Sequence, residues 1–439
     1  MNILIKYDKI YQNEGNFKGK QMEKNIKRFN INKKPIKPWS LLMLVEWIGS
    51  YPSLIFSRHK LTKVNCKGLK PPYIILSNHA SFYDFQVNVK ATFPHKSHWV
   101  ISIEEFIGKE WLMRAIGGIP KRKFTQGSVL VKNILTALRK NKKIVTIYPE
   151  ARFSLAGITE DIGKALGKLI KTANVPVVVL NQNGNFLRSP QWNKHPYRRF
   201  RPTATFTCVA TKEEIATLSA DEIQDRIEKA FVYDDYKWQY ENKVKIKCKK
   251  RAQNIHKILY QCPCCKTEFS MNSKDHKLWC EHCGKEWEMD YYGQLHCVNG
   301  EDTFNHVPDW YRWERQNVAE EVKNGSYYFE DMVRLDELVN CSKGFVTQGF
   351  VKMVHDYNGI TLSSEDPNFK FYLNKPIASM ASCHIEYNFK KRGVKKPGDA
   401  IDIATIENTW FVFPQTANNC LTKIHFAVEE LYKYQKDNS

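Results

Sequence analysis

The stretch Tyr73-Ile-Ile-Leu-Ser-Asn-His-Ala-Ser-Phe-Tyr-Asp84 joins a short apolar run to a polar turn. Its apolar part, Tyr73 to Leu76, is typical of a strand buried in a parallel sheet. Two similar runs follow further along the chain, and stretches with helical spacing of apolar residues alternate with them. This alternation predicts an α/β domain. The two runs are Lys143-Ile-Val-Thr-Ile-Tyr148 and Val175-Pro-Val-Val-Val-Leu180, and the helical stretches cover 128–140 and 161–173.

His79 and Asp84 are the candidates for chemistry in the polar turn. They are five residues apart, so they would not share a face of one regular helix. Asp84 can still reach the imidazole if His79 lies in the turn and Asp84 in the first turn of a helix that begins near Ser81. A carboxylate on one ring nitrogen leaves the other basic enough to take a proton from a hydroxyl. Alternatively, Ser81 and Asp84 only cap the helix.

Two further turns carry charged residues. Because ligands of open parallel sheets bind outside the carboxyl ends of the strands, we expect these residues to face the same crevice as His79. The guanidinium fork of arginine suits phosphate oxygens. Taken singly, the two cations of the first turn could equally be solvated surface charges. The candidates are Lys121 and Arg122 in Gly117-Gly-Ile-Pro-Lys-Arg-Lys-Phe124, and Glu150 and Arg152 in Tyr148-Pro-Glu-Ala-Arg-Phe-Ser154.

In order and spacing, these blocks resemble the motifs of the PlsC-like glycerolipid acyltransferases, the family that contains the 1-acylglycerol-3-phosphate acyltransferases. The resemblance covers 40–235 and includes Val175-Pro-Val-Val178 as a fourth block. It implies acyl transfer from acyl-CoA or acyl-carrier protein to a lysophosphatidate-like acceptor, without a covalent acyl-enzyme. His79 would be the general base and Asp84 would orient it. The acceptor headgroup would be bound by Lys121, Arg122, Glu150 and Arg152.

Two positions depart from the family pattern. The third block of the family usually has arginine three residues after the glutamate, whereas here Arg152 is two residues after Glu150 and Phe153 fills the third place. Val179 stands where the fourth block usually has a second proline. Both changes leave the His79–Asp84 pair intact and bear instead on the identity of the acceptor.

Five of the twelve cysteines fall within 22 positions of the chain. Cys262, Cys265, Cys280 and Cys283 form a C-x2-C-x14-C-x2-C pattern, with Cys264 to spare. Two thiolates on each of two tight turns can enclose a zinc ion with no open position, which predicts a structural site resembling a zinc ribbon. The alternative is a pair of redox dithiols. A cysteine cluster in a long chain without a signal peptide favours a reducing compartment.

Charge and hydropathy indicate an anionic partner and a membrane surface. The chain has 67 Lys and Arg against 46 Asp and Glu, a net charge of +21, which suits phospholipid, nucleic acid or a phosphorylated substrate. No apolar run reaches the roughly 18 residues of a membrane-spanning helix. The segment 39–60 is apolar but interrupted by Glu46, Gly49 and Pro52, and a basic tail, 1–38, precedes it. We therefore expect it to lie in the lipid interface on the cytoplasmic side; alternatively, it packs on the next domain.

The remaining sequence completes a division into domains. We expect an acyltransferase domain at 61–235, a basic linker at 236–260, a zinc ribbon at 261–300 and a β-rich domain at 301–439. Several strands followed by one helix near the C-terminus resemble a pleckstrin-homology-type fold. A rival function is a zinc-ribbon protein that binds nucleic acid or lipid and keeps an inactive acyltransferase fold. Acidic residues around the ribbon argue against nucleic acid: Glu281, Glu286, Glu288 and Asp290.

Overall fold

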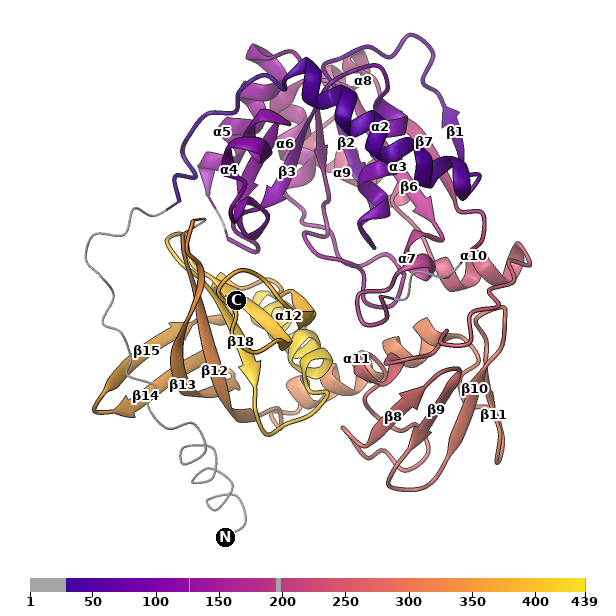
Figure 1. Ribbon diagram of the computed structural model, residues 1–439, viewed down its shortest axis with the longest axis vertical. Helices are drawn as coiled ribbons and strands as arrows, with labels where there is room; N and C mark the ends of the chain where they lie inside the picture. The colour runs from indigo at the N-terminus through magenta and orange to yellow at the C-terminus, as the bar shows by residue number, and fades with distance from the viewer. Residues whose placement is uncertain (1–28, 126, 195–198, 341, 439) are drawn as a thin grey trace. The chain divides into compact units, whose positions relative to one another are not determined.

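A computed structural model describes residues 29–125, 127–194, 199–340 and 342–438 (Figure 1). The chain separates into two compact units. The larger comprises described residues from 30–121 and 127–314, and the smaller comprises residue 29 together with 122–125, 315–340 and 342–438. Most of the predicted basic tail, 1–28, lies outside the described residues.

A seven-stranded sheet organises the larger unit. Its order is β1-β7-β6-β2-β5-β3-β4, and β2 pairs in parallel with both β5 and β6. Only the pairing of β7 with β6 is antiparallel in this sheet as described. The strands are β1 (Lys60–Val64), β2 (Ile74–Ser77), β3 (Ser97–Ser102), β4 (Gly118–Lys121), β5 (Ile144–Ile147), β6 (Val177–Asn183) and β7 (Thr203–Ala210).

Both faces of this sheet are covered, which explains why β2 and β5 are buried at every position and are mainly apolar. On one face Ile74 and Leu76 of β2 pack with residues of α6 and α9. On the other face Ile75 packs with Val87 of α3 and Leu54 of α2. The helices of this α/β layer are α2 (Ser40–Phe56), α3 (Tyr83–Thr92), α4 (Glu110–Ala115), α5 (Ser128–Leu135), α6 (Leu166–Ala173), α7 (Asn185–Arg188), α8 (Lys212–Thr217), α9 (Ala220–Ala230) and α10 (Asp235–Glu241).

The predicted α/β alternation is therefore confirmed by the structure. The helix predicted over 128–140 is α5 continued by a π-helical turn, Thr136–Lys140. The helix predicted over 161–173 begins later than expected, at Leu166. Ser219 and Glu222 form a capping box at the start of α9.

The predicted basic linker, 236–260, has two parts. Residues 240–250 are mostly exposed, whereas Ile255, Ile258, Leu259 and Tyr260 at its end are fully buried. The cysteine cluster follows in a four-stranded antiparallel sheet of order β11-β10-β9-β8. This sheet belongs to the larger unit, whose boundary falls after Glu314, inside α11 (Val307–Lys323). The strands are β8 (Met271–Lys274), β9 (Lys277–Cys280), β10 (Glu286–Met289) and β11 (Leu295–Cys297).

The smaller unit is β-rich and has a helix at its C-terminal end, α12 (Leu421–Asp437), as predicted. Its seven-stranded sheet is antiparallel throughout, with the order β15-β14-β13-β12-β18-β17-β16. A pleckstrin-homology-type fold stays a prediction. The strands are β12 (Phe329–Asn340), β13 (Gly344–Asp356), β14 (Gly359–Asp366), β15 (Phe369–Lys375), β16 (Ile385–Phe389), β17 (Gly398–Ala404) and β18 (Thr409–Pro414).

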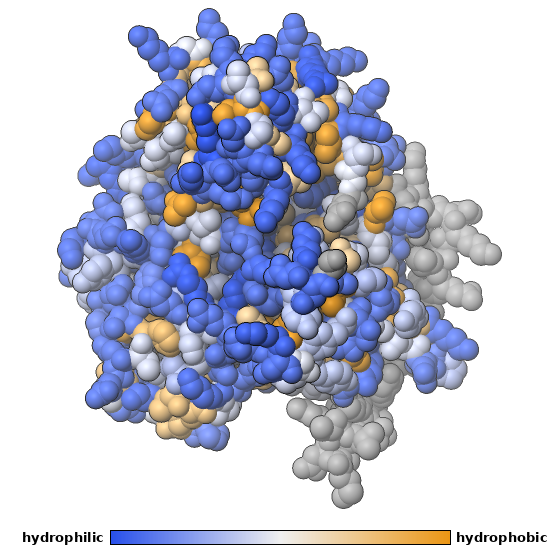
Figure 2. Space-filling model, turned by 180° about the vertical axis from the view of Figure 1, so that it is seen from behind, coloured by the Kyte–Doolittle hydropathy of each residue, from blue (hydrophilic) through white to orange (hydrophobic). Residues whose placement is uncertain are grey.

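Helix α2 occupies most of the segment predicted to lie in the lipid interface. Its Trp47 ring packs edge-on against Phe93, with the ring centroids 4.6 Å apart, whereas Leu41 and Ile48 are 71% and 72% exposed. The helix thus packs on its domain with one side and presents apolar side chains on another. In the part of the chain that the structure describes, no helix is both long and apolar enough to cross a membrane. The face drawn in Figure 2 is mainly hydrophilic, with hydrophobic residues in small groups.

Candidate active site and metal centre

The site is built on the turn that leaves β2. All four residues of β2 are buried, and the turn after it is tied to the neighbouring strand β6. Asn78 Nδ2 donates to the carbonyl oxygen of Gln182 at 2.9 Å, and the Gln182 N–H donates to Asn78 Oδ1 at 2.8 Å. The Asn78 side chain therefore extends the β2–β6 pairing by one step beyond the strand. This contact fixes the backbone position of the next residue, His79.

His79 and Asp84 meet as the sequence predicts. His79 Nδ1 lies 3.0 Å from Asp84 Oδ2. The same oxygen accepts the N–H groups of Ala80 at 2.6 Å and Ser81 at 2.8 Å, so the carboxylate holds the turn before α3 and contacts the imidazole at once. The N-cap residue of α3 is Phe82, and no side chain caps this helix, so the predicted capping is wrong, while the orienting role of Asp84 stays a prediction. The His79 side chain is 22% exposed and that of Asp84 only 1%.

Asn185, in α7 after β6, holds the other oxygen of this carboxylate. Its Nδ2 donates to Asp84 Oδ1 at 3.0 Å, and both residues are buried. Sequence reasoning missed this residue. The available signal was the polar run Asn181-Gln-Asn-Gly-Asn185 directly after a strand with an apolar start, since polar residues in that position commonly face a site.

Two aromatic rings pack against the imidazole of His79. The Tyr148 ring stacks on it with centroids 3.9 Å apart, and the Phe153 ring lies at 4.1 Å. A backbone bond from Ser154 N–H to the His79 carbonyl oxygen, 2.7 Å long, joins the turn after β5 to the turn after β2. Phe153, which departs from the family pattern, therefore contacts the predicted base itself.

Glu150 lies in a buried polar cluster. Its Oε1 accepts the hydroxyl of Tyr233 at 2.7 Å and the N–H of Glu160 at 3.1 Å. Burial raises the pKa of Glu150 to about 8, although these hydrogen bonds and nearby Arg152 oppose the rise. The carboxyl group is therefore mainly protonated at neutral pH and supplies no full charge to an acceptor.

Arg152 is also buried and pairs with Glu160 through a 3.3 Å contact from its Nη2 to Oε2. The second oxygen of Glu160 accepts the hydroxyl of Tyr311 at 3.1 Å. The structure thus brings Glu150 and Arg152 together, but as members of an internal cluster and not on an open crevice wall. Sequence reasoning missed Glu160, which follows the third block by six residues, and Tyr233 and Tyr311, which lie far from it in sequence; none of the three has a motif of its own.

Lys121 and Arg122 divide between the two units. Lys121 ends β4, and burial lowers its pKa. Arg122 belongs to the smaller unit, where its Nη1 donates to Thr409 Oγ1 at 2.9 Å, and it is only 5% exposed. The structure therefore does not join Arg122 to His79 in one compact unit, and the predicted role of Arg122 in headgroup binding stays a prediction.

The next residue, Lys123, lies in an acidic socket of the smaller unit. Its Nζ is 3.4 Å from Asp402 Oδ2 and 3.5 Å from Glu386 Oε1. His384 borders the same socket, with Nε2 3.1 Å from Glu386 Oε1. Two carboxylates on one largely buried lysine make residues 122–125 an integral part of the β-rich unit.

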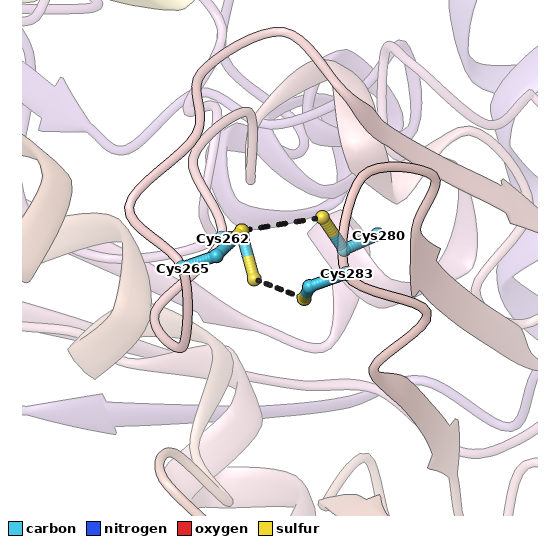
Figure 3. Close-up of side chains that lie close together, drawn as sticks. All are labelled: Cys262, Cys265, Cys280 and Cys283. Carbon is cyan, nitrogen blue, oxygen red and sulfur yellow. Dashed lines mark hydrogen bonds between the residues drawn. The ribbon is translucent and has the colours of Figure 1, made fainter.

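The four predicted cysteine ligands converge, as Figure 3 shows. Cys262 and Cys283 have their sulfurs 3.7 Å apart, as have Cys265 and Cys280, and all four sulfurs lie within 4.8 Å of one another. Four thiolates around a metal at about 2.3 Å would be separated by about 3.8 Å along each edge of the tetrahedron. The four thiols thus have the spacing of a closed tetrahedral site and could hold a metal ion.

In this α/β domain a histidine contacts a buried carboxylate at the carboxyl end of a central parallel strand, the edge of the sheet where ligands bind in such folds. Residues 57–181 match the family model described as Acyltransferase. The chain therefore carries an acyltransferase domain, and the predicted resemblance to PlsC-like enzymes is confirmed.

Among solved structures, the chain is similar to the 1-acyl-sn-glycerophosphate (LPA) acyltransferase PlsC from Thermotoga maritima, at 14% sequence identity. The similarity covers 43% of this chain and 76% of that one, with a TM-score of 0.36. No curated protein matches the chain.

Proposed function

We propose that the protein is a glycerolipid O-acyltransferase that moves an acyl chain from acyl-CoA or acyl-carrier protein to a lysophosphatidate-like acceptor. The observation that carries the proposal is the contact between His79 and Asp84 within the domain that matches the acyltransferase family. In this reaction His79 Nε2 takes the proton of the acceptor hydroxyl. The acceptor oxygen bonds to the thioester carbonyl carbon, the carbon–sulfur bond breaks, and the thiolate leaves and is protonated.

The surroundings of His79 support this role for the imidazole. Asp84 occupies Nδ1, so Nε2 is the nitrogen left for the acceptor. The two aromatic rings on the imidazole restrict its rotation. The Asp84 carboxylate is held by two backbone N–H groups and Asn185, and it can stabilise the imidazolium that forms during proton transfer.

We assign a structural zinc ion to Cys262, Cys265, Cys280 and Cys283. The sulfur spacing fits a tetrahedral site, and the four thiolates would leave no position for a substrate. Bound zinc would hold the two cysteine turns together, and the chemistry of acyl transfer would remain with His79. Zinc content of the purified chain, compared with that of a Cys280→Ser variant, tests the assignment.

We assign the protein to the cytoplasmic face of an anionic membrane, attached through α2. The exposed apolar residues of α2 recur at helical spacing, and the chain carries a net charge of +21. Apolar side chains would enter the headgroup region while basic residues attract anionic lipid, at about 1 kcal/mol per residue near the surface. The exposed apolar residues of α2 are Leu41, Leu44, Val45, Ile48, Ile55 and Phe56.

The test is transfer of a labelled acyl group from acyl-CoA and from acyl-carrier protein to a panel of lysophospholipids in liposomes. Wild type is compared with His79→Ala and with His95→Ala, a control that removes an exposed histidine of the same domain. We expect transfer that persists in His95→Ala and falls by about 10²–10⁴-fold in His79→Ala. Folded, zinc-loaded protein that transfers from neither donor would instead favour an inactive acyltransferase fold that binds lipid or nucleic acid.

A further inference from the structure

The cysteine cluster is bound to helix α11 through the backbone of one residue, Gln261. Gln261 immediately precedes Cys262. Its N–H donates to Glu314 Oε1 at 2.8 Å, and its carbonyl oxygen accepts the indole N–H of Trp310 at 3.0 Å. Both α11 side chains are fully buried. The first cysteine turn and the beginning of α11 are therefore fixed to each other.

The sheet β8–β11 and the two turns that carry the four cysteines, together called the cysteine module (residues 261–297), also contact this part of α11. Trp287 of β10 packs edge-on against Trp310, with ring centroids 4.9 Å apart, and both rings are fully buried. Burial also raises the pKa of Glu314 well above its ordinary value. Because this contact lies in a close-packed interior, a shift of the cysteine module is transmitted to α11.

Tyr311, next to Trp310 on α11, extends the connection into the acyltransferase domain. Its hydroxyl donates to Glu160 Oε1 at 3.1 Å, and the Tyr311 ring is only 1% exposed. Glu160 in turn pairs with Arg152 through Oε2 and donates its N–H to Glu150 Oε1. Every member of this series belongs to the larger unit.

From this series of contacts we propose that the cysteine module and α11 act as a brace, which means that they hold the third block, residues 148–154, in place. Tyr311 is the positioning residue of this brace. The hydroxyl of Tyr311 fixes the Glu160 carboxylate, and Glu160 fixes the guanidinium of Arg152 and one oxygen of Glu150. Metal binding at the four cysteines thereby supports the geometry beside His79. The effect on acyl transfer rests on the proposed function, but the positioning itself does not.

Tyr311→Phe in the full, metal-loaded chain tests the proposal because it removes the hydroxyl and keeps the ring. Tyr327→Phe is the matched control. Tyr327 is also buried, and its hydroxyl bonds to His355 Nδ1 at 3.0 Å in the smaller unit. The first readout is amide hydrogen exchange over 150–160. The second is the separation of KM from kcat in acyl transfer to lysophosphatidate.

We expect the Tyr311→Phe variant to keep its metal content, while its backbone amides over 150–160 exchange at least tenfold faster than in the wild type. KM should rise about tenfold with a smaller change in kcat. This size of effect corresponds to the loss of one hydrogen bond to a charged group. Removal of the metal from the wild type with a chelator should accelerate exchange over 150–160 as well as around the cysteines. Tyr327→Phe should change none of these quantities.

Exchange over 150–160 that is the same in Tyr311→Phe and Tyr327→Phe would overturn the proposal. So would chelation that loosens 262–283 and leaves 150–160 unchanged. If the wild type transfers no acyl group, the proposed function fails on its own, and the exchange measurements still decide whether the brace exists.

Discussion

The ring centroid of Phe153 lies 4.1 Å from that of His79. Phe153 stands at the position where the resemblance would place an arginine, so a cation is replaced by an apolar ring in contact with the predicted base. Together with Tyr148, this ring restricts the imidazole to the orientation that Asp84 requires.

Phe153→Ala should therefore lower kcat of acyl transfer by about tenfold, since an aromatic contact of this kind contributes about 0.5–1.5 kcal/mol beyond its buried area. Phe153→Tyr keeps the ring and should retain most of the activity. Steady-state kinetics of both variants check this expectation. Equal losses in the alanine and tyrosine variants would contradict a role for the ring.

Asp84→Asn should lower kcat by about 10²–10⁴-fold because the amide cannot stabilise a protonated imidazole as a carboxylate does. Asp221→Asn is the control, since Asp221 also lies in the first turn of a helix, α9, and is exposed. The measurement is kcat as a function of pH for both variants. An Asp84→Asn enzyme with the rate and pH profile of wild type would remove Asp84 from the mechanism.

Glu150 should make stability depend on pH. Its pKa is raised from 4.5 to about 8 in the folded protein, so between these values the folded state holds a proton that the unfolded state has lost. Unfolding then releases a proton, and the free energy of unfolding falls as pH rises through this window. The expected slope is about 1.4 kcal/mol per pH unit from this group, with little contribution below or above the window.

Glu150→Gln should remove that slope while keeping an oxygen for Tyr233 and the Glu160 N–H. Chemical denaturation of both proteins at pH 5, 6, 7 and 8 measures the difference. We expect the variant to gain stability relative to wild type as pH rises. Parallel curves would show that Glu150 ionises with an ordinary pKa.

Lys123→Met should destabilise the β-rich unit by about 3–5 kcal/mol, because it leaves two largely buried carboxylates without their cation. The triple variant Lys123→Met, Glu386→Gln, Asp402→Asn removes all three charges and should recover most of the loss. Denaturation followed by fluorescence compares the three proteins. No recovery in the triple variant would mean that the methylene packing of Lys123, and not its charge, stabilises the unit.

Leu41→Glu combined with Ile48→Glu should reduce binding to anionic vesicles by more than tenfold, since burying each of these side chains is worth about 1.5–3 kcal/mol. Ile406→Glu introduces one charge at a similarly exposed position of the smaller unit and is the control. Wild type should be released only in part by high salt. Complete release would contradict an apolar anchor in α2.

The strands and the pairing of His79 with Asp84 could be predicted because each depends on local pattern. Strands buried on both faces, such as β2 and β5, are mainly apolar, and the short polar turn after β2 brings two residues five positions apart within reach of each other. The burial of Glu150 and Arg152 could not be predicted. It depends on Glu160, a few residues beyond the third block, and on Tyr233 and Tyr311, which come from two distant parts of the chain.

Arg122 and the segment 236–260 show a second limit. Basic residues in the sequence suggested a headgroup ligand and a basic linker. Arg122 hydrogen-bonds to Thr409, 287 residues away, a contact that no local pattern predicts, and its role in headgroup binding stays a prediction. In the predicted linker, residues 240–250 are mostly exposed, whereas Ile255, Ile258, Leu259 and Tyr260 are fully buried. The net charge of such a segment indicates how polar its surface is, but it does not predict which residues the segment packs against.

The inclusion of Tyr311 in the same compact unit as His79 has a consequence for how such a protein can be divided or recombined. Glu160 has a hydrogen-bond partner at Tyr311, and Asp234 has an ion-pair partner at His306. A chain cut before residue 306 would keep both acids and lose both partners. The segment that contains the four cysteines and the start of α11 is therefore best kept together with the α/β layer when the chain is shortened or recombined.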